Sequence, residues 1–151
     1  PGLAVRARRG PAVLAPCLLA LALAACSRAP KEVTLKLAAV GEPLRYDKPE
    51  LKVPANSRVT LTLTNAAPGA ALSHNFVLVQ PGTADAVGVA AASAGGDRED
   101  IPSHYAVIAN SPPARPGEKV TVSFLAPPAG SYEFLCTVPS HAAMRGTFLV
   151  Q

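Results

Sequence analysis

Four side chains that bind soft or borderline metals stand in two short segments of the chain. Cys136, His141 and Met144 lie in one run near the C-terminus, and His74 lies far upstream. Together they offer one thiolate, two imidazoles and one thioether. A His₂Cys set with a long, weak axial Met is the donor set of a mononuclear blue-copper electron-transfer site. The pattern therefore predicts a copper site built from these four residues.

Each of these residues also has a plainer interpretation. His74 alone would be read as a core histidine, and Met144 as core filler. Cys136 with His141 could be a nucleophile and its base, and zinc is an alternative metal, although structural zinc sites are closed tetrahedral sets without Met. Three His and no evident orienting carboxylate disfavour the catalytic reading, so we expect no enzyme activity. His104 has no partner at a useful spacing, and we expect it in a surface loop.

The N-terminal residues 1–25 read as an export signal. A basic stretch (Arg6, Arg8 and Arg9) precedes an apolar core at residues 12–25. That core is too short to favour a membrane span, which needs about 20 apolar residues. It ends in Leu-Ala-Ala-Cys26, which resembles the bacterial lipoprotein signal, where the Cys becomes lipidated. The alternative is an ordinary cleaved signal with a chance Cys. We therefore predict a signal peptide at 1–25, a lipidated tether at 26–32, and an extracytoplasmic, lipid-anchored domain at 33–151.

The three cysteines support this organisation. Cys17 would leave with the signal and Cys26 would be acylated, so only Cys136 remains. A lone free thiol is a liability in an oxidising compartment unless something occupies it. Metal binding is the simplest occupation of Cys136.

Length and charge narrow the function classes. The chain has 151 residues, enough for one domain of ordinary size. Its net charge of +4 falls to about +1 without the three signal arginines, which leaves 11 basic against 10 acidic side chains. Such a domain has no broad basic field, so we expect no nucleic-acid partner.

From residue 33 onward apolar and polar residues alternate with a period of two, which predicts strands. The expected strands are residues 33–37, 59–63, 76–79, 106–109, 120–124, 132–136 and 147–150. Pro- and Gly-rich turns separate them, which favours an all-β Greek-key sandwich or barrel. Residues 83–103 break the pattern, and we expect a short helical or irregular insertion that crosses the outside of the sandwich, with the charged run at 97–100 solvated.

The strand at 132–136 must position the site. Alternation puts Tyr132, Phe134 and Cys136 on one face, so Cys136 is expected to enter from the core side at the strand end. The loop that follows would then return His141 and Met144 to the same point, and His74 would come from a different strand.

Residues 136–147 resemble the C-terminal copper loop of the cupredoxins, closest to the azurin and auracyanin groups, and residues 73–78 resemble their first-ligand strand. The similarity covers roughly residues 33–151, with 51–65 resembling the hairpin before the first His. By this resemblance His74, Cys136 and His141 would bind one type 1 copper ion equatorially and Met144 axially. Asn75 would brace the ligand loop near the sulfur and tune the potential.

The resemblance implies an electron carrier. Single electrons would pass between extracytoplasmic redox proteins, such as c-type cytochromes or membrane oxidoreductases, through weak and transient contacts. Residues 66–72 and 142–143 would form a small apolar face around an exposed imidazole edge. The alternative function is a periplasmic copper-binding or delivery lipoprotein without electron transfer.

The sequence departs from the family pattern at three places. Only two residues separate His141 from Met144, fewer than in azurins, auracyanins or plastocyanins. Ser73 and Ser140 each replace a frequent Gly. If position 140 needs a positive φ, Ser140 carries some strain.

Overall fold

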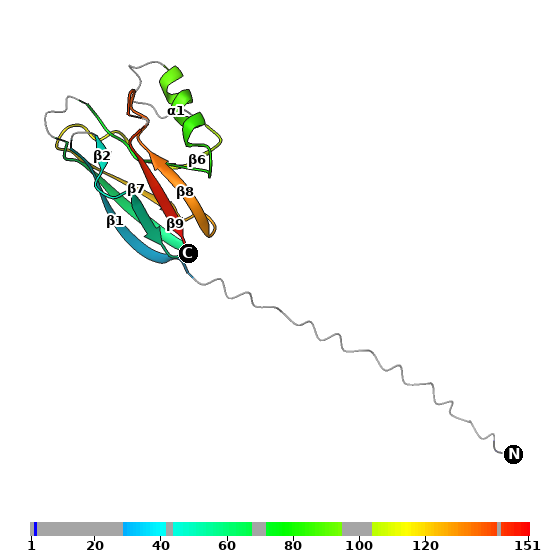
Figure 1. Cartoon of the computed structure of the whole chain (residues 1–151). Helices are drawn as coiled ribbons and strands as arrows, with labels where there is room; N and C mark the ends of the chain where they lie inside the picture. Colours follow the sequence, from blue (N-terminus) through cyan, green and yellow to red (C-terminus); the bar gives the residue numbers. More distant parts are fainter. Residues whose placement is uncertain (1, 3–28, 42–43, 68–71, 95–103, 142) are drawn as a thin grey trace.

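The computed structural model describes residues 2, 29–41, 44–67, 72–94, 104–141 and 143–151 (Figure 1). Most of the predicted signal peptide, Cys26 and the charged run at 97–100 lie outside these ranges, so the predictions made for them stay predictions. In the described part of the chain, no helix is long and apolar enough to cross a membrane.

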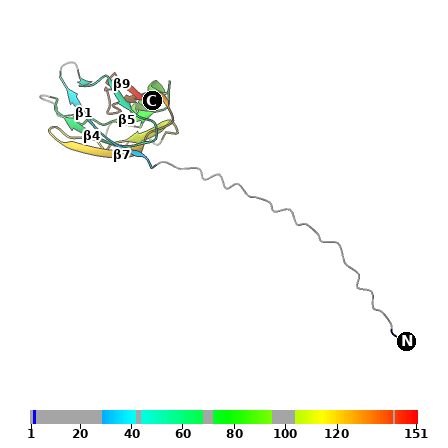
Figure 2. The ribbon, with the colours of Figure 1, turned by 90° about the horizontal axis from the view of Figure 1, so that it is seen from below.

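Two β-sheets pack face to face (Figures 1 and 2). The four-stranded sheet has the order β2-β1-β4-β7, from β1 (Lys31–Val40), β2 (Arg45–Tyr46), β4 (Ser57–Asn65) and β7 (Lys119–Leu125). The five-stranded sheet has the order β3-β9-β8-β5-β6, from β3 (Glu50–Val53), β5 (Val77–Val79), β6 (Val107–Asn110), β8 (Gly130–Leu135) and β9 (Arg145–Val150). The expected all-β sandwich is confirmed.

Alternating residues make the inner face of the four-stranded sheet. In β4 the inward residues from Ser57 to Asn65 are buried, and the threonines between them are partly exposed. β4 pairs parallel with β1, where Leu35 lies opposite Leu61, and antiparallel with β7, where Val122 lies opposite Leu61. The period of two in the sequence thus decides which side of each strand faces the other sheet.

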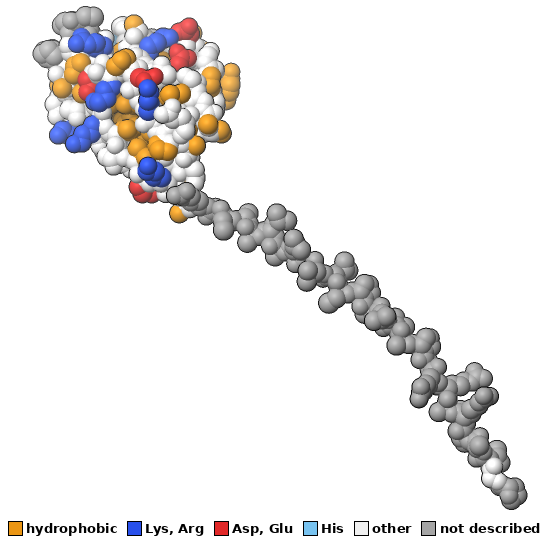
Figure 3. Space-filling model, turned by 60° about the horizontal axis from the view of Figure 1, so that its bottom comes forward, with side chains coloured by type: hydrophobic (Ala, Val, Ile, Leu, Met, Phe, Trp, Pro, Cys, Tyr) orange, Lys and Arg blue, Asp and Glu red, His pale blue; other side chains and the backbone are white. Residues whose placement is uncertain are grey.

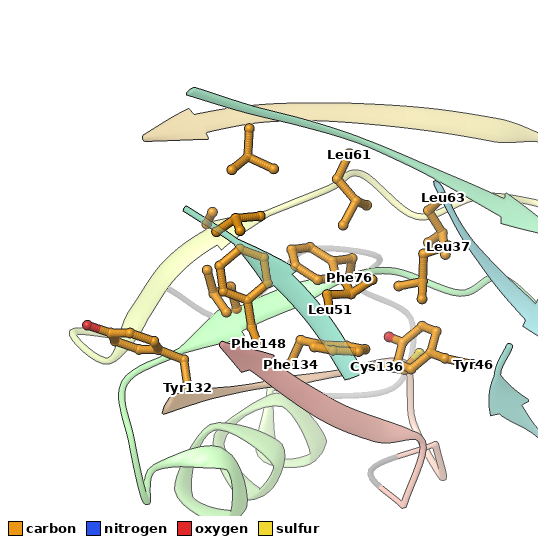
Figure 4. Packing of buried hydrophobic residues seen from close by; sticks show 14 of the residues in the cluster. Leu37, Tyr46, Leu51, Leu61, Leu63, Phe76, Tyr132, Phe134, Cys136 and Phe148 are labelled. Carbon is orange, nitrogen blue, oxygen red and sulfur yellow. The ribbon is translucent and has the colours of Figure 1, made fainter. Parts of the chain in front are cut away.

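Aromatic rings from both sheets and their edges fill the space between the layers (Figure 4). Phe76 and Phe134 lie with ring centroids 5.5 Å apart, and Phe124 and Phe148 lie 5.9 Å apart. Burying one such side chain contributes about 1.5–3 kcal/mol. The cluster extends without a break to Cys136, so one core supports both the sandwich and the thiol.

The expected insertion is helical at its start. Helix α1 (Ala84–Ser93) packs on the outer face of the five-stranded sheet (Figure 1). Its buried residues Ala84 and Val87 meet Val77, Val79 and Leu135. Small side chains on this helix allow close approach to the sheet.

The predicted hairpin at 51–65 is wrong. β3 pairs parallel with β9, whereas β4 pairs with β1 and β7, so the two strands lie in different sheets. The turn between them includes Asn56 at a φ of 54°. Leu51 of β3 and Leu61 of β4 are both buried in the core, and placing the two strands in opposite layers allows both side chains to face it. β2 was not predicted.

The described domain begins and ends at one end of the sandwich. The Lys31 amide donates to the Asn56 carbonyl at 3.0 Å, and the Ala55 amide donates to the Gln151 carbonyl at 2.8 Å. β9 starts at Arg145, directly after Met144, and its six residues span about 20 Å. The C-terminal run with Cys136 to Met144 therefore lies at the opposite end.

Candidate metal centre

Cys136 follows the last residue of β8 and faces the core. Tyr132, Phe134 and Cys136 all belong to the cluster between the sheets, as the alternation predicted, whereas Leu135 faces helix α1. The Cys136 amide donates to the Met144 carbonyl at 2.9 Å, which extends the pairing of β8 with β9 by one step. The thiol is fully buried and makes no disulfide.

The ligand loop closes on itself through two backbone hydrogen bonds. The His141 amide donates to the Val138 carbonyl at 3.0 Å, and the Met144 amide donates to the His141 carbonyl at 2.7 Å. Ser140 has a φ of 70°, which confirms the positive φ considered for this position. This tight path turns the chain back so that His141 returns to the sulfur.

His74 is held by an isolated bridge and does not lie on a strand proper. It exchanges two backbone hydrogen bonds with Ala114, of 3.0 and 2.7 Å, three residues before β5 begins. The prediction of a ligand on a regular strand is therefore wrong in this detail. The Asn65 amide nitrogen donates to the Ala114 and Leu72 carbonyls, each at 3.0 Å, and so ties this segment to the end of β4.

The structure brings three of the predicted ligands together. The Cys136 Sγ lies 3.9 Å from His74 Nδ1 and 3.8 Å from His141 Nδ1. The two imidazole rings stack with centroids 4.7 Å apart. The three donor atoms all lie within 4.8 Å of one another, and all three residues are buried. His104 is not part of this cluster, and its Nδ1 accepts a hydrogen bond from the Ala106 amide.

These spacings fit a metal ion between the three donors. With bonds of about 2.0 Å to nitrogen and about 2.3 Å to sulfur, as zinc shows, a trigonal arrangement separates N and S by about 3.7 Å. The observed separations of 3.8 and 3.9 Å agree with that value. One thiolate with two imidazoles is also the equatorial donor set that copper takes in electron-transfer sites.

Met144 lies beside this triangle. Its side chain is 2% exposed and belongs to the same apolar cluster as Cys136. Its backbone bonds to both Cys136 and His141, so the two-residue interval after His141 still returns Met144 to the site.

The surroundings favour neutral imidazoles. Burial lowers the pKa of His74 to about 4, and the nearby His141 adds to this effect. Burial also lowers the pKa of His141. Uncharged imidazoles keep a lone pair free for a metal, so no proton has to leave either ring at neutral pH.

The thiol experiences two opposing influences. Burial raises the pKa of Cys136, while backbone N–H groups of Asn75 and Val138 point to the sulfur and lower it. Such hydrogen bonds stabilise a thiolate. A metal held here would take the sulfur as a thiolate, and the two N–H groups would stabilise its charge.

Asn75 links the His74 segment to the ligand loop. Its side-chain amide donates to Thr137 Oγ1 at 2.9 Å, and its Oδ1 accepts from the Thr137 amide at 2.9 Å. All of these groups are buried. The two bonds hold the residue next to Cys136 in one place relative to His74.

Sequence reasoning missed two residues at this end of the molecule. Asn65 is the last of the alternate β4 residues that face the core. A polar residue at such a position could have been noticed in the sequence as a candidate for a structural hydrogen bond. Tyr46 donates its hydroxyl to the Asn75 carbonyl at 2.6 Å. Nothing in the short segment around Tyr46 distinguishes it in sequence from the other tyrosines.

The expected apolar face is described only in part, since residues 68–71 and 142 lie outside the described ranges. Ala66 and Ala143 are exposed, and Leu72 is 48% exposed. His141 keeps 5% of its surface accessible, so the edge that reaches solvent is small.

Comparisons with known proteins agree with this geometry. The profile of copper-binding proteins of the plastocyanin/azurin family matches residues 33–151. Auracyanin-A of Chloroflexus aurantiacus is 41% identical over 122 residues, which cover 78% of this chain and 74% of the relative.

Solved structures give the same result. The structure of auracyanin A, described as a "blue" copper protein from Chloroflexus aurantiacus, has a TM-score of 0.71 and 39% identity over 80% of this chain and 99% of that one. An azurin from Methylomonas sp. strain J has a TM-score of 0.69 and 26% identity over 79% and 98% of the two chains. The chain thus belongs to the plastocyanin/azurin family of cupredoxins, the copper-binding proteins that carry electrons.

Proposed function

We propose that this protein is a lipid-anchored, extracytoplasmic blue-copper electron carrier. In this proposal His74, Cys136, His141 and Met144 would together hold one copper ion. Copper bound there would alternate between Cu(II) and Cu(I) and so take up and release one electron at a time.

The convergence of one sulfur and two Nδ1 atoms at 3.8–3.9 Å carries the proposal. The imidazoles are already neutral and stacked, and the Asn75–Thr137 hydrogen bonds fix the loop that holds the thiol. Ligands that are held in place before the metal binds move little between oxidation states. Such constraint suits electron transfer better than exchange of the metal with another protein.

Burial of the cluster argues against the other classes of function. Cys136 is fully buried, so a nucleophile there would have no access to a bulky substrate. Copper delivery usually relies on exposed ligands, whereas His74 and Met144 are 0% and 2% exposed. The protein therefore suits retention of its metal.

The position of the chain ends supports the tether. A segment that precedes Lys31 would join the domain at the end that holds Gln151, opposite to the ligand loop. An anchor there would leave the metal-binding end directed toward partners. On the face shown in Figure 3, charges of both signs are interspersed, which agrees with weak protein partners and not with nucleic acid.

We propose c-type cytochromes or membrane oxidoreductases as the partners, docked where Ala66, Leu72 and Ala143 are exposed. Placing a charge there, as in Ala143→Glu, should slow electron exchange with a cytochrome and leave the copper spectrum unchanged. Thr121→Glu, on the exposed side of β7, is the matched control. Equal rates for both variants would remove this face from the proposal.

The function is tested by adding copper(II) to the domain and recording its visible and electron-spin spectra, followed by voltammetry. We expect an intense thiolate-to-copper band and a reversible one-electron wave. Cys136→Ser should abolish the band, because it removes the sulfur. Copper binding without a reversible wave would favour the copper-delivery alternative.

A further inference from the structure

Tyr46 reaches the metal centre from the opposite sheet. It lies on the two-residue strand β2, whose pairing with β1 places Tyr46 opposite Ala39. Its side chain crosses the core, where its ring lies 5.2 Å from that of Phe134 (Figure 4). Its hydroxyl donates to the Asn75 carbonyl at 2.6 Å in a buried hydrogen bond.

The Asn75 carbonyl differs from those of its neighbours. The His74 carbonyl accepts from the Ala114 amide at 2.7 Å, and the Phe76 carbonyl accepts from the Ser111 amide at 2.9 Å. Both carbonyls thus accept from backbone N–H groups of the segment 111–114. The Asn75 carbonyl points the other way, into the core, and the phenol of Tyr46 supplies its donor.

Contacts with three residues therefore converge on Asn75. Its side chain is bonded twice to Thr137, its carbonyl accepts from Tyr46, and its N–H points to the sulfur of Cys136. A residue fixed at its side chain and at its carbonyl has little freedom to rotate its N–H away from the sulfur. The phenol acts on the metal centre through Asn75 and does not itself belong to the ligand set.

We propose that Tyr46 is a positioning residue that holds the Asn75 N–H on the Cys136 sulfur and thereby raises the reduction potential of the bound copper. The inference rests on the proposed copper function. An N–H donor on the sulfur stabilises its negative charge and weakens its donation to the metal, so the reduced state is favoured. Loss of the phenol hydrogen bond lets Asn75 relax and lowers the potential.

The chain offers a matched control for this idea. The Tyr132 hydroxyl also donates to a backbone carbonyl, that of Pro128, at 2.8 Å. Tyr132 lies at the other end of the same core, as Figure 4 shows. Tyr46→Phe and Tyr132→Phe each remove one phenol-to-carbonyl hydrogen bond and keep the ring, but only the first removes a bond to Asn75.

The experiment compares both variants with the unsubstituted protein. Hydrogen exchange of the Asn75 amide, measured by NMR on the metal-free protein, should become roughly two- to tenfold faster in Tyr46→Phe and stay unchanged in Tyr132→Phe. In the copper protein, Tyr46→Phe should shift the oxidised-to-reduced equilibrium toward the oxidised form by a similar factor and should shift the thiolate-to-copper band.

Unchanged exchange and potential in Tyr46→Phe would overturn the proposal, and so would equal changes in both variants, which would indicate a general loosening of the core. If Tyr46→Phe does not fold, the exchange of the Tyr46 hydroxyl proton with solvent is measured in the unsubstituted protein. Slow exchange supports the hydrogen bond to Asn75, and fast exchange overturns the proposal. The metal-free measurement does not need copper, so failure of the electron-transfer function would be recognised separately by the absence of a one-electron wave.

Discussion

The four-stranded sheet and the end of the sandwich that carries the ligand cluster are built in different ways. In the sheet, β1, β4 and β7 pair in long continuous registers, and the inward side chains between the ends of β4 are apolar. At the ligand end, the segments are short, and side chains bond to backbone groups of distant residues. Asn65, Asn75 and Tyr46 each make such a bond. The sheet is therefore stabilised by many equivalent contacts, and the ligand end by a few individual ones.

This difference predicts different responses to substitution. A change within the sheet should lower the stability of the whole domain and leave the geometry of the ligand cluster intact. A change at the ligand end should cost less stability and alter the site more.

The largest loss of stability is expected for Leu61→Ala, in the middle of β4. Leu61 is fully buried, and its cavity should lower the free energy of unfolding by about 2–5 kcal/mol. The copper spectrum of the folded fraction should not change, because the neighbours of Leu61 in register are Leu35 and Val122. Denaturant unfolding and the visible spectrum check the two parts, and a shifted thiolate band would contradict the proposed separation.

Asn65→Ala should cost less stability and affect the site more. It removes the donor to the Leu72 and Ala114 carbonyls, which should lower the free energy of unfolding by about 1–3 kcal/mol. Since Ala114 holds the His74 backbone, copper affinity should fall as well. Thr62→Val is the control, because the Thr62–Thr121 hydrogen bond is exposed and lies within the sheet. If Thr62→Val lowered the copper affinity as much as Asn65→Ala does, the distinction between the two regions would be wrong.

The pH dependence of stability should arise at the ligand end. The folded protein keeps the pKa of His74 near 4, below the ordinary value of 6.5. The unfolded chain therefore binds a proton between these values and the folded chain does not, so stability falls as pH decreases from about 6.5 to about 4. The lowered pKa of His141 adds to the same trend. Denaturant unfolding of the metal-free protein at several pH values measures this loss, and His74→Gln should reduce the slope.

The smallest effect is expected from the two non-glycine residues with positive φ. Ser140 in the ligand loop has a φ of 70°. Asn56, in the turn that joins β3 to β4, has a φ of 54°. Asn tolerates this conformation better than Ser. Ser140→Gly should therefore stabilise the protein by up to about 1 kcal/mol, whereas Asn56→Gly should be neutral or slightly destabilising. Thermal unfolding of both variants checks this, and the opposite order would refute the argument from strain.

The same contrast explains how much could be predicted from sequence. The strands of the four-stranded sheet follow from alternation in residues such as Val59 and Leu61, because a local period of two reports which side is buried. Cys136 and His141 were recognisable because their types and spacing are unusual. The ligand cluster could thus be expected before its geometry was known.

The features that sequence did not reveal depend on distant pairing. β3 pairs with β9 and β4 pairs with β1, and both partners are far away in the chain, so no local pattern distinguished β3 and β4 from a hairpin. The role of Tyr46 arises only when β2 is placed opposite Asn75. The bridge of His74 with Ala114 likewise joins two segments that are remote in sequence.

In the proposed site, Cys136, His74 and His141 together bind one ion. X-ray absorption at the copper edge of the loaded protein measures these bonds. We expect one sulfur at about 2.3 Å or slightly less and two nitrogens at about 2.0 Å. A copper ion bound without sulfur, or with a single imidazole nitrogen, would contradict the proposed site.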